Sequence, residues 1–234
     1  MEEKVEYERL LPAEFNERFE ACPVVYVPVG SLEWHGEHMA LGNDSLKMHA
    51  LCCEAARLGG GIVYPAIYYC IPGLAPADPS RYKNDSTFWG EPEVLRTLLL
   101  ATLQSLEKVG FRVAILTTGH TPPQQVQMMR DVAGEYQGKM HVHGTCDMDF
   151  GDEINFTSDH GAMWETSILW HAFPGLVDLT RLDPDPEVKP FNVFGKDPRT
   201  EASPSLGKQA IQIVARDMAA LAGKLLAAQT GGGN

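Results

Sequence analysis

The chain has 234 residues, 44% of them apolar, a length that suits one sizeable core. It carries 31 acidic and 19 basic side chains, so its formal net charge is −12. This charge disfavours nucleic acid and anionic membranes as partners, because both bind basic surfaces. No apolar run reaches the length of about 18 residues that a membrane helix needs, and the charged N-terminus lacks the apolar core of a signal peptide.

The cysteines favour a reducing compartment. Their number is odd, their spacing is irregular, and no CxxC pair occurs. This pattern disfavours a disulfide scaffold, so we expect small buried thiols and a cytoplasmic location. The cysteines are Cys22, Cys52, Cys53, Cys70 and Cys146.

Predicted strands and helices alternate along the chain. Strands are predicted over 24–29, 62–69 and 111–117 and around Val142. Helices are predicted over 10–21, 45–58 (with Ser45 as a cap), 92–109, 122–137, 164–172 and about 206–228. The alternation predicts a single α/β domain over 1–234, a three-layer sandwich with a mostly parallel sheet flanked by helices. We expect a flexible tail at 230–234.

A proline-rich segment over 71–92 interrupts this alternation. Long irregular segments within a compact domain are usually functional or disordered. Phe88 and Trp89 favour an ordered loop that forms a pocket wall, and packing in the core is the alternative.

Potential metal ligands follow the first predicted strand. Glu33 and His35 are two residues apart, so both side chains point the same way in extended backbone. Asp44 can return to them through the loop closed by Gly42. Carboxylates and imidazoles suit first-row metal ions, and a carboxylate can bridge two of them.

His120 follows the strand predicted over 111–117. Parallel strands end at one edge of the sheet, where α/β proteins bind ligands, so His120 should meet the first group there. An isolated E-x-H pair is more often a solvated loop, but agreement between two distant segments favours a metal site. We expect surface or core roles for five other histidines, which are His38, His49, His141, His143 and His171.

Three sequence blocks resemble the creatininase family. The run PVGSLEWHGEH at 28–38 resembles its P-x-G-S-x-E-x-H-G-x-H signature. Residues 110–120 are similar to the G-F-x-x strand that ends in N-G-H, and DHGAMWETS at 159–167 is similar to the H-A/G-G-x-x-E-T-S segment. The blocks occur in the family's order.

This resemblance implies a hydrolase with two divalent metal ions (zinc, manganese or iron) and a homo-oligomeric assembly, often a hexamer. By residue matching, the metal ligands would be Glu33, His35, Asp44 and His120, with Asp44 bridging. His160 would match the histidine that transfers a proton. Asp159 either orients that histidine or remains solvated.

Several positions depart from creatininase itself. The family's N-G-H reads T-G-H here, and the glutamate ligand two residues later is replaced by Pro122. Because proline cannot coordinate a metal, Glu165 is the candidate replacement, and water is the alternative. Phe156 matches the tryptophan that covers the substrate in creatininase, and Asp159 matches its neighbouring glutamate. These changes disfavour creatinine as the substrate.

The expected reaction is attack on a carbonyl carbon by hydroxide from metal-bound water, with His160 passing a proton to the leaving group. We expect the bond to be a cyclic amide, a formamide or a similar C–N bond in a small polar molecule. The alternative is ring opening of a keto-inositol or another cyclic ketone, like 3-dehydro-scyllo-inosose hydrolase. Polar residues that could bind a polyol favour it, namely Asp78, Arg81, Lys83, Asn84 and Asp85.

Two further alternatives differ in class. A non-catalytic metal-binding homologue is supported by Pro122, but the retention of the other candidate ligands argues against it. A serine or cysteine nucleophile is disfavoured, because no G-x-S-x-G motif occurs and no cysteine has an evident base.

Overall fold

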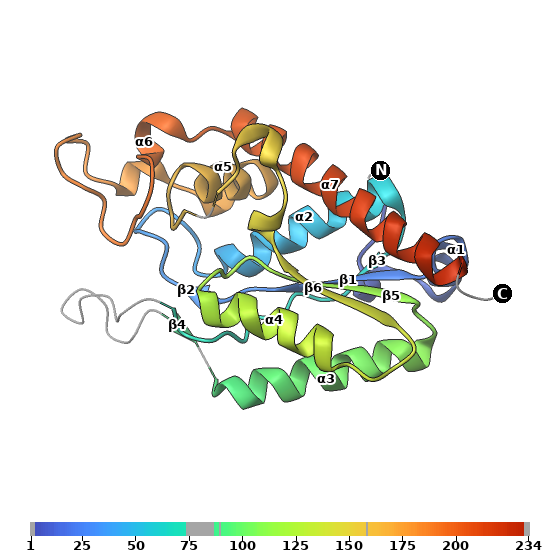
Figure 1. The fold of residues 1–234 in the computed structure, drawn as a ribbon. Helices are drawn as coiled ribbons and strands as arrows, with labels where there is room; N and C mark the ends of the chain where they lie inside the picture. The colour runs from blue at the N-terminus through green and yellow to red at the C-terminus, as the bar shows by residue number, and fades with distance from the viewer. Residues whose placement is uncertain (1–2, 74–86, 89, 158, 232–234) are drawn as a thin grey trace.

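The computed structural model describes residues 3–73, 87, 88, 90–157 and 159–231, and its centre is a four-stranded parallel sheet (Figure 1). The strand order is β3-β1-β5-β6. These strands are β1 Val24–Val29, β3 Ile62–Val63, β5 Val113–Thr118 and β6 His141–Cys146. A separate antiparallel pair joins β2 Leu32–Glu33 to β4 Thr87–Phe88.

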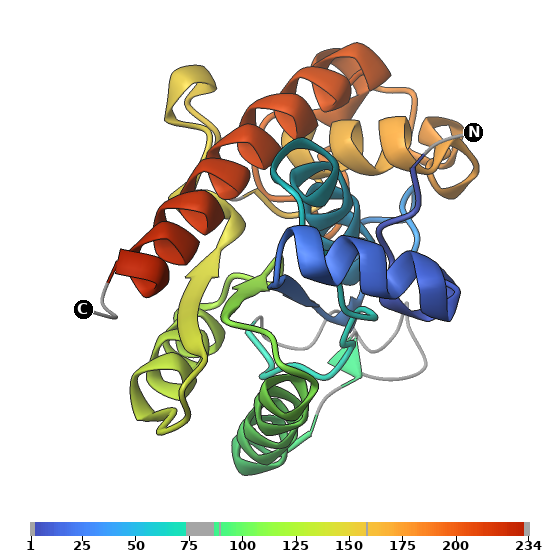
Figure 2. The same cartoon turned by 90° about the vertical axis from the view of Figure 1, so that its right-hand side faces the viewer.

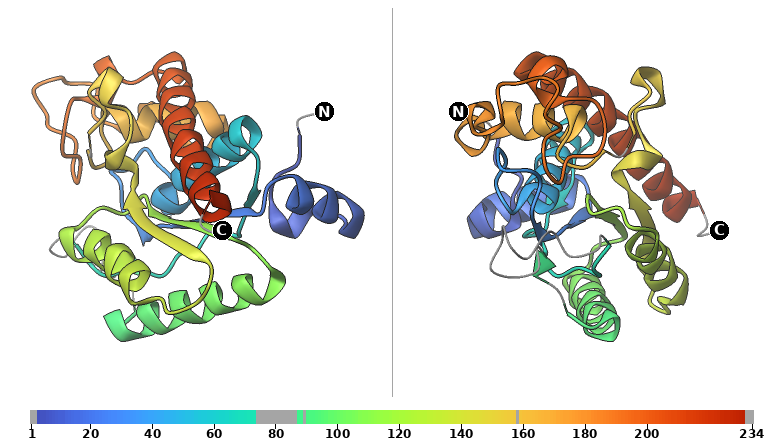
Figure 3. Two further views of the ribbon diagram at one scale, coloured as in Figure 1. Left: turned by 45° about the vertical axis from the view of Figure 1, so that its right-hand side comes forward. Right: turned by 90° about the vertical axis from the view of Figure 1, so that its left-hand side faces the viewer.

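Helices cover both faces of the sheet. They are α1 Pro12–Ala21, α2 Asn43–Gly59, α3 Pro92–Val109, α4 Pro123–Glu135, α5 Met163–Ala172, α6 Pro198–Glu201 and α7 Pro204–Gly231. Helices α2, α5 and α7 lie on one face, and α3 and α4 lie on the other (Figures 1 and 2). Helix α7 runs along both α2 and α5 (Figure 3). The predicted fold class is therefore confirmed.

Strand β1 supplies apolar side chains to both layers. Val24 and Tyr26 pack with α2, α5 and α7, whereas Val25, Val27 and Val29 pack with α3 and α4. A strand buried on both faces needs apolar residues at every position, which explains the unbroken apolar run in the sequence.

Helix α2 begins at Asn43, two residues before its predicted start. Gly42 occupies the cap position, and the expected cap Ser45 lies inside the helix, where its hydroxyl donates to the carbonyl oxygen of Ile67 at 3.2 Å. The predicted cap was therefore wrong. Asp44 consequently lies in the first helical turn and not in a loop.

Other boundaries differ modestly. The strand predicted over 62–69 is confined to β3, and Ile67 adds only an isolated bridge to Val29. The antiparallel pair of β2 and β4 was not predicted. The expected tail at 230–234 overlaps the end of α7, and residues 232–234 lie outside the described part of the chain.

Much of the segment over 71–92 lies outside the described residues, namely 74–86 and Trp89, as does the side chain of Phe88. The polar residues between Asp78 and Asp85 belong to this part. All five cysteines are free in the structure, and four of them are buried, whereas Cys22 is only half-buried. Over the described ranges, no helix combines the length and apolar character needed to cross a bilayer.

The contact between α5 and α7 depends on Gly207. A methyl group added there would lie 1.9 Å from the carbonyl oxygen of Ser167 in α5. Gly207→Ala should lower the free energy of unfolding by about 1–3 kcal/mol, because one helix must move away. Urea unfolding measures this change.

Gly223→Ala is the matched control in the same helix. Among the described residues, no atom outside the adjoining turns of α7 lies within 4 Å of the added methyl group. Alanine is also the better helix former, so stability should rise by up to about 1 kcal/mol. Equal effects of the two substitutions would contradict the close approach at Gly207.

Candidate metal centre

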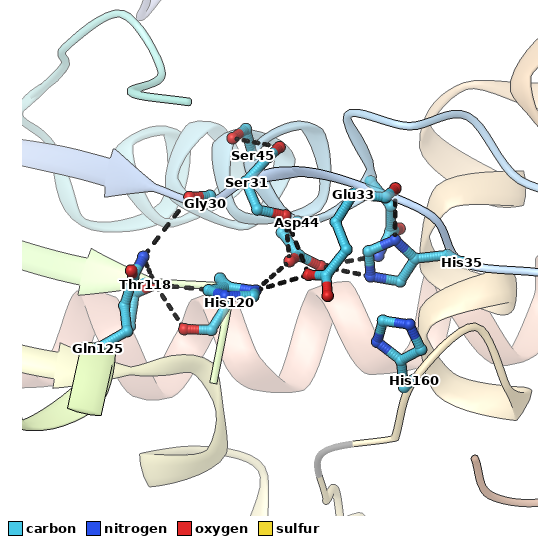
Figure 4. Close-up of polar contacts among 12 residues, drawn as sticks. Gly30, Ser31, Glu33, His35, Asp44, Ser45, Thr118, His120, Gln125 and His160 are labelled. Carbon is cyan, nitrogen blue, oxygen red and sulfur yellow. Dashed lines mark hydrogen bonds and ion pairs between the residues drawn. The ribbon is translucent and has the colours of Figure 1, made fainter. Parts of the chain in front are cut away.

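The site lies where the carboxyl ends of β1 and β5 meet. After β1 the chain continues to α2 on one face of the sheet, and after β5 it continues to α4 on the other face. Such diverging connections open a crevice at the strand ends. The residues gathered there are Glu33, His35, Asp44 and His120 (Figure 4).

Two glycines allow α2 to approach these strand ends. A Cβ atom at Gly30 would lie 2.2 Å from the backbone nitrogen of Ser45. At Gly119, it would lie 2.5 Å from the carbonyl oxygen of Asp44. The first turn of α2 can therefore insert between the two strand ends, and the helix dipole favours the carboxylate of Asp44 at this position.

Asp44 lies between two histidines. Its Oδ1 is 2.9 Å from Nε2 of His35, and its Oδ2 is 2.9 Å from Nδ1 of His120. The hydroxyl of Ser31 donates to Oδ2 at 2.7 Å, and the amide of Asn43 donates to Oδ1 at 3.1 Å. One carboxylate thus faces two separate groups of potential ligands.

The first group consists of Glu33, Asp44 and His120. Each offers one ligand atom, and these atoms lie within 4.8 Å of one another. Oε2 of Glu33 is 2.9 Å from Nδ1 of His120. Oε1 of Glu33 is buried and has no hydrogen-bond partner within the described structure. An orphaned buried oxygen of this kind is suited to a cation.

The second group consists of His35, Asp44 and Glu165, and its ligand atoms also lie within 4.8 Å of one another. Glu165 lies in the first turn of α5, with Oε2 at 3.4 Å from Nε2 of His35. The amide of Gly161 donates to the same oxygen at 2.8 Å. All three ligand side chains are buried.

Backbone carbonyls hold the outer nitrogen of each histidine. Nδ1 of His35 is 3.1 Å from the carbonyl oxygen of Glu33, and Nε2 of His120 is 3.0 Å from that of Ile71. Because a carbonyl only accepts, these nitrogens carry a hydrogen. The opposite nitrogens face carboxylates, to which they donate when the ring is protonated, and they are free to coordinate a metal ion when the ring is neutral. Metal-binding histidines commonly have this arrangement. The residues therefore fit metal binding, and Asp44 belongs to both groups of potential ligands.

The carboxylates also change the pKa values of both histidines. Burial by itself would lower these pKa values, but Asp44, Glu165 and Glu33 raise the pKa of His35 to about 9. Asp44 and Glu33 raise the pKa of His120 to about 10 against the same effect of burial. The cluster of carboxylates therefore requires nearby positive charge, which protons or metal ions can supply.

His160 lies beside the second group. Its ring stacks on that of His35, with centroids 4.2 Å apart, and its Nε2 is 2.8 Å from the carbonyl oxygen of Trp34. Burial and the charge of His35 lower the pKa of His160, which favours a neutral imidazole. His160 also forms a third potential ligand group with Glu33 and His35.

Asp159 is bonded to α5. Its carboxylate accepts hydrogen bonds from the backbone nitrogens of Trp164 at 2.7 Å and Glu165 at 3.2 Å. It thereby caps the helix that carries Glu165. Burial and the charge of Glu165 raise the pKa of Asp159 to about 7. A role in catalysis stays a prediction.

His38 belongs to none of the three ligand groups found among the described residues. It is buried, and its Nε2 lies 2.9 Å from the hydroxyl oxygen of Thr166. Burial is the main cause that lowers its pKa to about 4. Its place in the core agrees with the role expected from the sequence.

A cavity of about 300 Å³ opens onto the two groups, and its wall includes His160 and Pro122. Phe156 does not line it, because this side chain packs edge-on against Trp164 in the core. Phe194 lines it instead, with 55% of its surface exposed and its ring 5.7 Å from that of His160.

Phe194 and Asn192 lie at the site but were not predicted from the sequence. Phe194 reaches the site through a backbone bridge with His160, and the side chain of Asn192 donates to the carbonyl oxygen of Trp34 at 2.6 Å. Neither residue belongs to a recognisable motif, so no local signal could have identified them.

The chain is similar to known proteins over most of its length. A family model described as "Creatininase: Creatinine amidohydrolase" matches residues 8–222. The creatinine amidohydrolase of Pseudomonas putida is 28% identical over 205 residues, and the alignment covers 77% of each chain.

Solved structures are similar over nearly the whole chain. A creatininase structure has a TM-score of 0.71 at 23% identity, covering 95% of this chain and 98% of that chain. A candidate creatinine amidohydrolase from Bacteroides fragilis has a TM-score of 0.75 at 19% identity, covering 96% and 97%. Similar structures also include a manganese creatininase, a variant of Zn–Zn type and a variant complexed with creatine.

Asp44→Asn tests whether one carboxylate serves both groups. We expect about two metal ions per chain in the wild type. The variant should purify with well under half of that content, because both groups lose a shared anionic ligand. Elemental analysis after chelator-free purification measures the content. Asp131→Asn, on the exposed surface of α4, is the control and should keep both ions. Full metal content in Asp44→Asn would contradict the shared position.

Proposed function

The chain belongs to the creatininase (creatinine amidohydrolase) family, and we propose that it is a two-metal hydrolase of a C–N bond in a small polar molecule. The observation that carries this proposal is the position of Asp44, whose two oxygens each approach a histidine at 2.9 Å. Family membership also supports a homo-oligomeric assembly.

In this proposal, each group of ligands holds one divalent ion. Glu33 and His120 would hold the first ion, His35 and Glu165 would hold the second, and Asp44 would contribute to both. Nitrogen and oxygen ligands of this kind suit zinc, manganese and iron. Divalent ions bound there lower the pKa of a coordinated water and polarise a carbonyl oxygen. Glu165 supplies the carboxylate that Pro122 cannot.

His160 is the proposed proton carrier. It lies in the wall of the cavity and stacks on the ring of His35. Its lowered pKa keeps the imidazole neutral near pH 7, so it can accept a proton from the attacking water. The same ring can then donate that proton to the leaving nitrogen.

The cavity wall favours a planar ring as the substrate. A volume of about 300 Å³ suits a small molecule, and the exposed ring of Phe194 offers a flat apolar surface beside His160. This combination supports a cyclic amide or a formamide on a ring, whereas Thr121 and Asp159 of the same wall could bind hydroxyl groups of a polyol such as a keto-inositol.

A substrate screen tests the bond type. Protein loaded with Zn²⁺ or Mn²⁺ is incubated with a panel of cyclic amides and formamides and with keto-inositols, and products are followed by mass spectrometry. We expect turnover in the first panel. Turnover of keto-inositols alone would establish C–C cleavage, and no turnover by fully loaded protein in either panel would favour a non-catalytic homologue.

His160→Ala tests the proton carrier. The variant should retain its metal ions and lose about 10²- to 10⁴-fold in kcat, the usual contribution of a positioned acid–base group. His141→Ala, at an exposed position of β6, is the matched control and should leave kcat unchanged. Retention of kcat in His160→Ala would remove this residue from the mechanism.

A further inference from the structure

A buried lysine lies against the candidate metal centre. Only 3% of the side chain of Lys47 is exposed. Its Nζ donates to Oε1 of Glu165 and to Oδ2 of Asp147, both at 2.8 Å, and to the carbonyl oxygen of Gly119 at 3.1 Å. These bonds use all three hydrogens of the ammonium group. This cation has no role in the hydrolysis proposed above.

Lys47 joins the segments that carry the candidate ligands. It lies about one helical turn after Asp44 in α2, on the same face of the helix. Gly119, whose carbonyl it binds, directly precedes His120. Glu165 comes from α5, 118 residues along the chain from Lys47. One side chain therefore connects three separate sources of ligands.

Lys47 also determines which oxygen of Glu165 faces the second group. It holds Oε1, while Oε2 lies 3.4 Å from Nε2 of His35 and accepts the amide hydrogen of Gly161. With both oxygens held, the carboxylate loses its rotational freedom when the protein folds and not when a metal ion binds. Such preorganisation raises affinity without adding a contact to the metal.

Asp147 balances the charge of Lys47. Only 2% of its side chain is exposed, and its Oδ2 lies 2.8 Å from Nζ. Burial by itself would lower the pKa of Lys47, but Asp147 and Glu165 raise it well above its usual value, so the group stays charged. Because the two charges offset each other, Lys47 can orient Glu165 without strong repulsion of a nearby cation.

We propose that Lys47 is a positioning residue that presents Oε2 of Glu165 to the metal ion of the second group. The inference rests on the proposed two-metal centre. No direct bond joins Lys47 to the side chains of Glu33 or His120 in the described structure. Loss of Lys47 should therefore weaken the second metal position selectively.

The double variant Lys47→Met/Asp147→Asn tests this inference. It removes one positive and one negative charge, so the net charge of the site is unchanged and Asp147 is not left as a buried carboxylate without its lysine. Zn²⁺ is titrated into metal-free protein in competition with a chromophoric chelator. The Kd of one ion should rise about 10- to 100-fold, the usual effect of removing a group that supports a ligand, while the other changes less than about threefold.

Arg216→Met/Glu153→Gln is the matched control. It removes an exposed ion pair of 3.0 Å that lies away from the ligand groups, and both Zn²⁺ affinities should remain unchanged. Circular dichroism of the metal-free proteins checks the fold. If the Met/Asn variant does not fold, Lys47→Gln/Asp147→Asn, which keeps hydrogen-bonding groups at both positions, takes its place in the same titration.

Glu165→Gln shows whether Lys47 acts through Glu165. This variant should weaken the same ion, and adding Lys47→Met/Asp147→Asn should cause little further loss, because both changes disrupt one interaction. If Glu165→Gln binds both ions with unchanged Kd values, the proposed ligand set fails. If Glu165→Gln loses one ion but the Lys47 variants keep both, or lose both equally, or bind the second ion more tightly, the positioning role is wrong.

Discussion

The carboxylate of Asp44 between the rings of His35 and His120 is the contact on which the rest of the site depends. It requires α2 to begin between the ends of β1 and β5, which Gly30 and Gly119 permit by leaving room for the helix backbone. The helix is held there by α7, which packs along both α2 and α5. Packing far from the crevice thus maintains distances of 2.9 Å within it.

Charge balance is the second constraint. Glu33, Asp44 and Glu165 are all buried, and burying several carboxylates together is costly unless cations accompany them. Two histidines with raised pKa values meet this need in the protein without metal ions, and two divalent ions would meet it more fully. Lys47 contributes a further positive charge, but the negative charge of Asp147 offsets it. The remaining effect of Lys47 is to orient the carboxylate of Glu165.

The functional groups of the site lie on the connections between the strands of a rigid sheet, in loops and in the first turns of α2 and α5. His160 lies in the turn before α5, and the backbone bridge to Phe194 joins this turn to a segment much later in the chain. Asp159 accepts hydrogen bonds from the first backbone nitrogens of α5, including that of Glu165, and so helps to fix the position of Glu165. A rigid scaffold with functional groups on its connections is a common arrangement, because loops can change without loss of the core.

The sequence by itself determined the parallel α/β fold, the family, and the meeting of Glu33, His35 and His120. Apolar runs and helical spacing are local patterns, and parallel strands end at a common edge, so residues after two such strands must converge. Only the tertiary structure decided that Asp44 lies on a helix, that Lys47 holds Glu165 and that Phe194, rather than Phe156, lines the cavity. These features depend on contacts between distant segments, for which side-chain packing and not local periodicity is the physical cause.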